Sequence, residues 1–471
     1  MRIRILGRMT IYVITGLLML FHFSLVPAMP VSAATTWYVD GDCPGTPDGS
    51  QSNPFCTIQD AVDAAADGDT INVASGTYAG AIVDREVKII GASGGTSVIT
   101  SGVPHKVSST LYTAFRPFGD DADGAEIRNF TINCNVSVSF SLGVYAVEVD
   151  DIVVDSLTIH DTMQGINNWG GSNWEITNNR LFGTVAVSGG GIGIFLGAKP
   201  QQACCGNLVR DNIVDATATA ETYSCPGICL CLDTRYGGYD NLDGTEDISG
   251  NQILYNNIMA SGVNNGVGIE VGTILGDSES DPDRTDPDKI AAIMLAGAVH
   301  DNVVKGNTIY GPCEGVYFYN VTGLTITRNT IKDCVNNGIY VEHGHSGIAI
   351  YCNNIVGSAV YGIENQTTTT VHAINNWWGH FSGPSGEGPG SGDAVTTYVD
   401  YDPWLSGPWQ VTPPCGTPPP SDHPTPPGEE PVGITVMPVD KVGLVMPWAV
   451  LTGLFIVAAW LWLLLKSRIF R

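Results

Sequence analysis

Two kinds of short segment alternate along most of this chain, and they leave little freedom in its fold. One kind ends in asparagine followed by an apolar residue, and the other begins with glycine. The asparagine segments read WEITNNRLFG, LVRDNIV, ILYNNIM, VVKGNTIYG, LTITRNTI and IAIYCNNI, and between them lie GIGIFLG, GICLCLD, GVGIEVG, GVYFYNV and GIYVEHG. Such a repeat indicates a solenoid, because one unit buries its apolar face only when the next unit stacks on it.

The spacing of the repeat predicts two strands in each coil. The apolar residues near the end of the asparagine segments are Ile132, Ile159, Leu181, Ile213, Ile258, Ile309, Ile331, Ile355 and Trp377. The basic coil is 22 to 24 residues long, which suits two strands with Gly and Asn turns and is too short for two helices. We therefore predict an all-β fold, a parallel β-helix.

The asparagine position has a structural and a functional interpretation. Aligned amides could bind an ion or a sugar, or they could form a ladder of side chains that bond to one another from coil to coil. We favour the ladder, because Asn tolerates a left-handed backbone in turns. Its expected members are Asn179, Asp211, Asn256, Asn307, Asn329, Asn353 and Asn375.

Three coils carry extra chain, at about 197–206, 233–250 and 272–300. Each insertion follows a glycine-led strand, and coils stack about 4.8 Å apart. We therefore expect the three loops to leave one corner of the helix and to form a single wall, where binding sites usually lie. The alternative is neutral drift at a permissive corner.

Both ends of the chain differ from the repeat. Basic residues precede an apolar stretch at 11–26, and small residues at 31–33 offer a cleavage site, which is typical of a secretory signal peptide. Residues 443–465 carry no charge and precede a basic tail, as in a membrane span with a cytoplasmic C-terminus. The predicted organisation is signal peptide 1–33, N-terminal cap and first coils 34–124, β-helix 125–406, proline-rich linker 407–440, and transmembrane anchor with basic tail 441–471.

Charge and cysteine content fit an exported protein. The two end segments hold 7 of the 21 basic residues and none of the 47 acidic residues, which leaves 47 acidic against 14 basic residues between them. This balance argues against nucleic acid as a partner. The 12 cysteines should mostly be paired outside the cytoplasm, with Cys43–Cys56 and Cys313–Cys334 as predicted disulfides. Five more cysteines between 204 and 231 favour disulfides over a metal site.

Two segments resemble a known family. TIQDAVDAAADGDTINVASGTYAG from Thr57 resembles the start of pectin-lyase-like right-handed parallel β-helix proteins, where a helix covers the N-terminal end. AINNWWGHFSGPSG from Ala373 resembles the closing coil and cap of surface β-helix proteins. The resemblance covers about residues 36–406 and implies a right-handed β-helix whose N-terminal end is closed by a short helix. It is weak for activity, since that superfamily includes lyases, hydrolases, adhesins and scaffolds. The catalytic motifs of polygalacturonase-like and pectate-lyase-like members are not matched.

One outward face of the glycine-led strands suggests a sugar-binding surface. Alternation along the strands is expected to expose aromatic and acidic residues beside the insertions, where they could stack on sugar rings and accept hydroxyl hydrogens. The predicted contacts are Trp169, Phe195, Glu270, Tyr317, Tyr319 and Tyr340. Glu342 and Glu364 lie in adjacent coils, at a carboxylate spacing of about 5 Å that would suit a retaining glycosidase. The alternative is an ordinary solvated acidic face.

The second insertion also suggests a cation site. DNLDGTED places Asp240, Asp243, Glu246 and Asp247 in a short glycine-containing loop, and calcium binds six to eight oxygen ligands in such loops. A more acidic stretch, DSESDPDRTDPD, follows in the third insertion. The competing interpretation for both is a hydrated acidic loop.

Together these features predict a monomeric ectodomain, exported and anchored at the cell surface, that binds extracellular or envelope polysaccharide. Cleavage by a lyase or glycoside hydrolase mechanism is a further option. The rival functions are a structural or adhesive surface protein, for which the helix is only a stalk, and a calcium-stabilised module that binds another protein.

Overall fold

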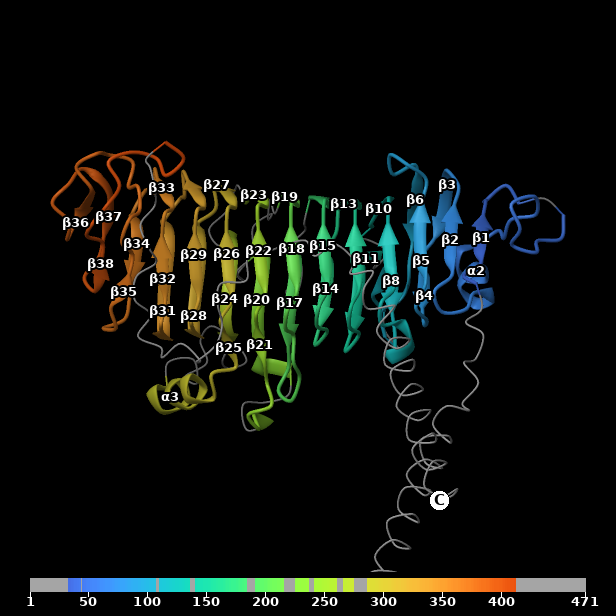
Figure 1. The fold of residues 1–471 in the computed structure, drawn as a ribbon, viewed down its shortest axis with the longest axis horizontal. Coiled ribbons are helices and arrows are strands. Elements are labelled where there is room, and N and C mark those ends of the chain that lie inside the picture. Colours follow the sequence, from blue (N-terminus) through green and yellow to red (C-terminus); the bar gives the residue numbers. More distant parts are fainter. Residues whose placement is uncertain are drawn as a thin grey trace, which may run out of the picture. The chain divides into compact units, whose positions relative to one another are not determined.

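The strands of successive coils stack in parallel and form three long sheets. In this computed structural model, residues 33–411 are described, apart from residues 44, 107–109, 136–139, 184–190, 216–224, 237–240, 261–265 and 275–285. The predicted signal peptide, most of the linker and the predicted anchor lie outside the described residues. No helix among the residues that are described is long and apolar enough to cross a membrane. Figure 1 shows the strands of the three sheets side by side, from β1 to β38.

Each coil from β2 to β34 contributes a strand to each of the three sheets, and sheet 1 has further strands at both ends. Sheet 1 contains β1 (Thr36–Val39), β2 (Thr70–Val73), β5 (Lys88–Gly91), β9 (Glu126–Arg128), β12 (Val153–Asp155), β15 (Glu175–Thr177), β18 (Leu208–Arg210), β22 (Gln252–Leu254), β26 (Val303–Lys305), β29 (Thr325–Thr327), β32 (Ala349–Tyr351), β35 (Val371–His372) and β38 (Val399–Asp400). Sheet 2 contains β3 (Gly76–Ala79), β6 (Ser97–Ser101), β10 (Phe130–Asn133), β13 (Thr158–His160), β16 (Arg180–Phe182), β19 (Ile213–Asp215), β23 (Asn257–Met259), β27 (Thr308–Tyr310), β30 (Thr330–Lys332) and β33 (Asn354–Val356).

Sheet 3 is the sheet of the glycine-led segments. Its strands are β4 (Ala81–Val83), β8 (Tyr112–Pro117), β11 (Phe140–Val147), β14 (Gln164–Trp169), β17 (Ile192–Ala198), β20 (Cys225–Asp233), β24 (Gly266–Ile274), β28 (Glu314–Thr322), β31 (Asn337–Ser346), β34 (Tyr361–Asn365), β37 (Gly392–Val395) and β36 (Pro384–Gly386). Three short strands extend it, namely β7 (Val103–Pro104), β21 (Ile248–Ser249) and β25 (Val299–His300). The prediction of two strands in each coil is therefore wrong, because each coil has three short strands.

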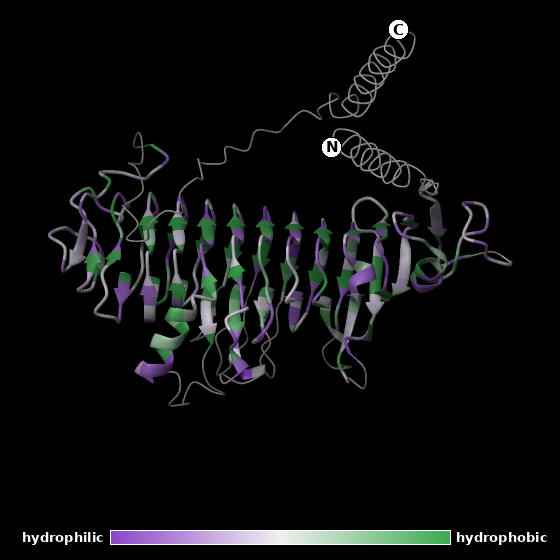
Figure 2. Cartoon of the chain, turned by 60° about the horizontal axis from the view of Figure 1, so that its bottom comes forward, coloured by the Kyte–Doolittle hydropathy of each residue, from purple (hydrophilic) through white to green (hydrophobic). Residues whose placement is uncertain are grey.

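The core is filled by columns of branched apolar side chains, one from each sheet. In sheet 2 the aligned residues are Ile132, Ile159, Leu181, Val214, Ile258, Ile309, Ile331 and Ile355, all fully buried. The predicted repeat is confirmed except at Ile213 and Trp377, whose neighbours Val214 and Trp378 are the fully buried residues. Each buried side chain of this size contributes about 1.5–3 kcal/mol. Figure 2 shows apolar residues recurring along the strands of neighbouring coils.

The asparagine ladder is present and is structural, as predicted. Amide Nδ2 atoms donate to the Oδ1 atom of the next coil at 2.9–3.0 Å. Its members are Asn179, Asn212, Asn256, Asn307, Asn329, Asn353 and Asn376, all buried. Two predicted members are therefore wrong by one residue: Asp211 and Asn375 have left-handed backbones, with φ of 58° and 56°, and form the turn just before the ladder residue.

A second ladder, which the sequence analysis missed, lies at the corner between sheet 3 and sheet 1. Nδ2 of Asn207 donates to Asn251 at 2.8 Å, and Nδ2 of Asn251 donates to Asn302 at 3.0 Å. Each is again preceded by a residue with positive φ, such as Gly250 or Asp301. Two corners of the coil are thus held by buried amides that bond from coil to coil.

The insertions leave the helix at the predicted corner, between sheet 3 and sheet 1. β21 and β25, from the second and third insertions, pair in parallel, and Ala203 of the first insertion forms a bridge with Asp247. Helix α3 (Pro287–Ala296) of the third insertion contacts β28 and β31. Figure 1 shows α3, β21 and β25 on the same side of the stack. The predicted wall is confirmed for the described residues. Extra chain also separates sheet 2 from sheet 3, at 184–190, 216–224 and 261–265, outside the described residues.

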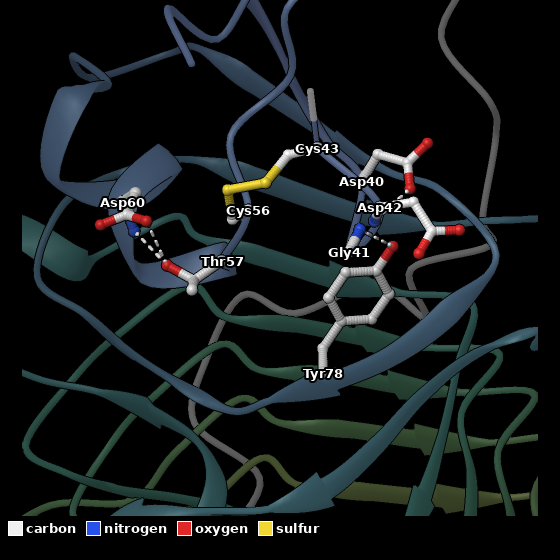
Figure 3. The surroundings of a disulfide bond; sticks show 8 residues. All are labelled: Asp40, Gly41, Asp42, Cys43, Cys56, Thr57, Asp60 and Tyr78. Carbon is white, nitrogen blue, oxygen red and sulfur yellow. Dashed lines mark hydrogen bonds between the residues drawn. A yellow bond between two sulfur atoms is a disulfide. The ribbon is translucent and has the colours of Figure 1, made fainter. Parts of the chain in front are cut away.

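A short helix lies at the predicted place near the N-terminus. Helix α2 (Ile58–Ala64) contacts β1, β2 and β4, and buries the side chains of Ile58, Ala61 and Val62. Thr57 caps its first turn, because its hydroxyl accepts from the Asp60 amide at 3.1 Å and donates to the Asp60 carboxylate at 2.7 Å. The predicted disulfide Cys43–Cys56 is formed beside it (Figure 3). That α2 closes the end of the β-helix remains a prediction.

Candidate functional site

The register of sheet 3 is set by a column of glycines, because no side chain fits at that point. A Cβ atom on these residues would lie less than 3.0 Å from the carbonyl oxygen of the glycine in the next coil, at Gly193, Gly268, Gly315 and Gly338. The aligned residue is the second glycine of GIGIFLG and of GVGIEVG. The predicted columns, counted from the first glycine, were therefore out of register by two residues in these coils.

The corrected register gives two outward columns. One contains Glu270, Tyr317, Tyr340 and Glu364 on β24, β28, β31 and β34. The other contains Gly272, Tyr319 and Glu342 on β24, β28 and β31. Glu342 and Glu364 are therefore not register neighbours, so the spacing argument for a carboxylate pair is wrong.

Trp169 and Phe195 belong to a separate group nearer the N-terminus. Their ring centroids are 4.3 Å apart, and Phe195 packs with the buried thiols of Cys229 and Cys231. Phe195 is only 4% exposed, whereas Trp169 is half-buried. Of these two predicted sugar contacts, only Trp169 is accessible.

The structure brings six of the predicted residues into one network, which we call the Tyr–Glu cluster. Tyr319 donates its hydroxyl to Glu270 at 2.6 Å, and Tyr317 donates to Glu342. The rings of Tyr317 and Tyr340 lie 5.3 Å apart. The cluster consists of Glu270, Glu314, Tyr317, Tyr319, Asn337, Tyr340, Glu342 and Glu364.

Two members of the cluster, Glu314 and Asn337, were missed by the sequence analysis. They lie in the column just before the glycines. A Cβ atom on Gly315 would point toward the core side chain of Ile331, so the in-and-out alternation breaks at the glycine and Glu314 shares a face with Tyr317. In the sequence, each of these residues stands directly before an aligned glycine, and a polar residue at that position could have indicated them. Nδ2 of Asn337 donates to Glu364 at 2.7 Å.

Glu314 is the most perturbed carboxyl group of the cluster. Burial raises its pKa to about 7, and the charge of Glu364 adds to this rise against hydrogen bonds from Asn336 and Asn337. Its Oε2 atom is buried and has no hydrogen-bond partner among the described residues. Glu314 is therefore able to give or take a proton near neutral pH.

The tyrosines respond to the same environment. Burial, together with the charges of Glu342, Glu364 and Glu314, raises the pKa of Tyr340 to about 12. Burial, together with the Glu270 charge, holds the pKa of Tyr319 well above its usual value. These phenols stay protonated and act as hydrogen-bond donors.

Burial limits which members can touch a ligand. Tyr319 is 2% exposed, Glu270 4% and Tyr317 9%, so these three predicted contacts do not present an open aromatic groove. Helix α3 covers part of the same face, where Ile290 and Met294 approach Gly344. The partly accessible members are Glu314, Tyr340, Glu364 and Glu342, and the Glu342 side chain is 30% exposed.

The predicted calcium loop is organised by backbone hydrogen bonds. The Glu246 carboxylate accepts from the backbone amides of Gln201, Asp243 and Gly244 at 2.8–3.2 Å. Asp243 accepts from Thr245, and Asp247 lies 3.4 Å from His300. Asp240 is outside the described residues. Among residues 33–411 as described, no group of three or more His, Cys, Asp or Glu side chains is arranged to hold a metal ion, and calcium remains a prediction.

The second predicted disulfide is not formed. Cys313 and Cys334 are both buried, and no disulfide joins them. The Sγ atom of Cys334 lies beneath Gly315, where a Cβ atom would contact it at 3.2 Å, so its side chain is directed into the helix. In the cysteine group of the insertions, Cys204, Cys205, Cys229 and Cys231 are also free thiols, against the expected pairing.

Comparisons with known proteins give one family-model match and several similar solved structures. The family model described as "Periplasmic copper-binding protein (NosD)" matches residues 284–382. Among curated protein sequences, none matches the chain. The chain resembles the A-module of the mannuronan C-5 epimerase AlgE4 of Azotobacter vinelandii, with 14% identity and a TM-score of 0.47 over 78% of this chain and 98% of that chain.

Two further solved structures are similar. An alginate lyase from Paenibacillus sp. str. FPU-7 has 15% identity and a TM-score of 0.35, with 78% of this chain and 100% of that chain covered. XylC in complex with xylose has 10% identity and a TM-score of 0.44, with 80% and 85% covered. Values this low assign no activity. The parallel sheets and the family-model match confirm the resemblance to pectin-lyase-like right-handed β-helix proteins.

Copper, which the family description names, does not fit the described side chains of 284–382. No cluster of three or more suitable ligands is present in the part of the chain described here. His345 is buried and bonds to Thr367 at 3.0 Å, and burial lowers its pKa to about 4. Burial raises the pKa of the Cys334 thiol, which disfavours the thiolate that a metal needs.

Proposed function

We propose that this protein is exported, anchored at the cell surface, and binds extracellular polysaccharide across the outer face of sheet 3. The observation that carries the proposal is the Tyr–Glu cluster. Tyr340 offers a half-buried ring, which packs at a tilt against Tyr317 and lies near enough to Glu314, Glu342 and Glu364 to feel their charges. An aromatic face among acceptors for hydroxyl groups is the chemistry that a sugar ring requires.

Cleavage would use Glu314 as the acid in place of the predicted pair. Because its pKa is raised to about 7, Glu314 could protonate the leaving glycosidic oxygen while a second carboxylate takes a proton from the attacking water. Glu364, whose charge interacts with Glu314 and which is held by Asn337, is the candidate for the second role. The glycosidic C–O bond breaks, and water supplies one hydroxyl and one proton to the two products.

Binding is tested by Tyr340→Ala in the full chain, with retention measured in gels that contain a panel of polysaccharides. The matched control is Tyr310→Ala, because Tyr310 is an exposed tyrosine on sheet 2. We expect Tyr340→Ala to weaken retention on at least one polysaccharide by roughly tenfold, the size typical of one lost aromatic contact. Equal retention of both variants on every polysaccharide would refute the proposal.

Cleavage is tested separately, by the release of reducing ends from a polysaccharide that is retained. Glu314→Gln keeps the shape of the side chain and removes its proton chemistry. We expect it to abolish release while retention persists. Release that is unchanged in Glu314→Gln would exclude Glu314 as the acid.

One observation favours a structural or adhesive role as the second candidate. The outward side chains of Phe195, Cys229, Cys231, Tyr317 and Tyr319 are buried, so they form a second apolar layer on sheet 3. Such a layer stiffens a stalk without any ligand. A chain that is retained by no polysaccharide in the panel favours this function.

A further inference from the structure

A pocket with several cationic side chains lies on the outer face of sheet 3, far from the Tyr–Glu cluster. It has a volume of about 370 Å³ and is lined by β8, β11, the segments beside them, and Lys199 after β17. Arg116 and Tyr145 both line it and lie on neighbouring strands. The register places them in the column of sheet 3 that continues to Tyr340.

Three basic side chains meet at this pocket, in a protein in which acidic residues outnumber basic ones by 47 to 21. They are Lys106, Arg116 and Lys199. None of the three forms an ion pair within the described part of the chain, whereas Lys88, Arg128 and others elsewhere do. Ion pairing within the fold therefore does not explain why these three side chains converge.

The arginine is held in place by apolar and backbone groups. Its guanidinium carbon lies 4.4 Å from the centre of the Phe118 ring, and one N–H donates to the carbonyl oxygen of Pro104 at 3.4 Å. A guanidinium has five N–H donors in a planar fork. Stacking on Phe118 orients that fork and leaves donors for a carboxylate or sulfate.

The other walls also suit an anionic sugar. The Nζ atom of Lys199 lies 5.6 Å from the centre of the Trp169 ring, and the Tyr145 ring meets the buried His105 ring edge to face at 5.0 Å. Burial lowers the pKa of His105, and the positive charges of Lys106 and Arg116 lower it further. Imidazole thus stays neutral, and Nδ1 donates to the Leu111 carbonyl oxygen at 3.2 Å.

Two acidic residues belong to the pocket and limit its charge. Asp120 lies at the start of the 3-10 helix η1 (Asp120–Ala122), and Glu148 accepts a hydrogen bond from Gln202 at 2.8 Å. The three cations outnumber these two carboxylates. An anion would therefore be drawn to the arginine and lysine side, and sugar hydroxyls could donate to the acidic side.

We propose that this pocket binds a sugar residue that carries a carboxylate or sulfate group, so that the polysaccharide recognised by sheet 3 is acidic. This inference rests on the proposed function and specifies its substrate class. Seven strand spacings of about 4.8 Å separate Arg116 from Tyr340, or roughly 34 Å. An acidic polymer lying across the sheet would place an anionic residue in the pocket and a ring against Tyr340.

The test compares three sugars that differ only at carbon 6, namely glucose, glucuronate and glucose 6-sulfate, by ligand-observed NMR with the full chain. Hydrogen bonds to charged groups are strong enough to give a preference of roughly tenfold or more for the anions. We expect Arg116→Met to remove this preference and Arg116→Lys to retain part of it. Preference for one anion over the other identifies whether a carboxylate or a sulfate is recognised.

The matched control is Arg180→Met. Arg180 also stacks on an aromatic ring, with its guanidinium carbon 5.5 Å from the Phe182 ring centre, but it lies on sheet 2. Equal binding of glucose and both anions, or an anion preference that survives in Arg116→Met, would overturn the inference. Retention of neutral polysaccharides through Tyr340 would then still stand, so the two proposals fail separately. Thermal midpoints of all variants show whether the fold is intact.

Discussion

The asparagine ladder predicts a large loss of stability from a single amide. The Asn307 side chain donates to the carbonyl oxygen of Ile253 at 2.8 Å and to Asn329 at 3.0 Å, and its Oδ1 accepts from the backbone and side chain of Asn256 at 2.8 and 3.0 Å. Asn307→Ala deletes all four bonds in a fully buried site. Because each bond contributes about 0.5–1.5 kcal/mol, we expect a loss of about 4 kcal/mol.

Denaturant unfolding of the full chain measures this loss, read as a change in midpoint at constant slope. Gln252→Ala is the control, since Gln252 is an exposed amide on β22 of sheet 1, and its replacement should change stability by less than about 0.5 kcal/mol. If Asn307→Ala were no more destabilising than Gln252→Ala, the ladder would contribute nothing measurable. The reasoning that coil-to-coil amide bonds stabilise the stack would then be refuted.

Three further predictions concern other parts of the fold. Gly315→Ala forces a Cβ atom against the Gly338 carbonyl and the Ile331 side chain, and should lower the free energy of unfolding by about 1–3 kcal/mol in a denaturant titration. Gly41→Ala is the control, since the nearest atom to its Cβ would lie at 3.7 Å, and it should be nearly neutral. The folded-state pKa of Glu314 is raised from 4.5 to about 7, so the folded protein binds a proton that the unfolded chain has lost, and stability should fall as pH rises from 4.5 to 7. Glu314→Gln should flatten this fall, measured as the thermal midpoint at each pH. An unchanged pH dependence in Glu314→Gln would contradict the raised pKa. The Cys43–Cys56 bond spans 13 residues, and its reduction should cost about 3 kcal/mol of stability. A reductant should therefore lower the thermal midpoint of the natural chain, and should leave the midpoint of a Cys43→Ser, Cys56→Ser variant unchanged.

The stacking of coils could be predicted from the sequence because the repeat has a regular spacing. Apolar residues recur at the spacing of one coil, and an asparagine recurs beside them. The errors arose where two polar residues are adjacent, as in Asp211-Asn212 and Asn375-Asn376. There the first residue takes the left-handed turn and the second points along the stack, and composition alone does not distinguish them.

The candidate site was predicted less completely, for two physical reasons. Segments with two glycines offer two registers, and only the close approach of backbones at Gly268 and Gly315 selects one. In addition, alternation along a strand tells which face a side chain is on, but not what covers that face. For this reason Tyr317 and Tyr319 were correctly placed on the outer face and wrongly expected to be exposed.

The cationic pocket could not have been found from local patterns. Its basic residues come from three separate stretches of chain, at 106, 116 and 199. No stretch is basic by itself in this acidic protein. Only the register of sheet 3, which sets β8 and β11 side by side, brings Arg116 next to Tyr145, and the first insertion then adds Lys199.

The amide ladders continue without a break past coils of very different length. Successive members of the first ladder are separated by 33, 44, 51, 22, 24 and 23 residues along the chain, yet the bonds between them differ by no more than 0.1 Å. Residues inserted at a corner therefore do not change how the neighbouring coils stack. A β-helix of this kind can gain, lose or exchange a surface loop in one step. A peptide grafted after β31 would be displayed beside α3 without any change in the sequence of the coils around it.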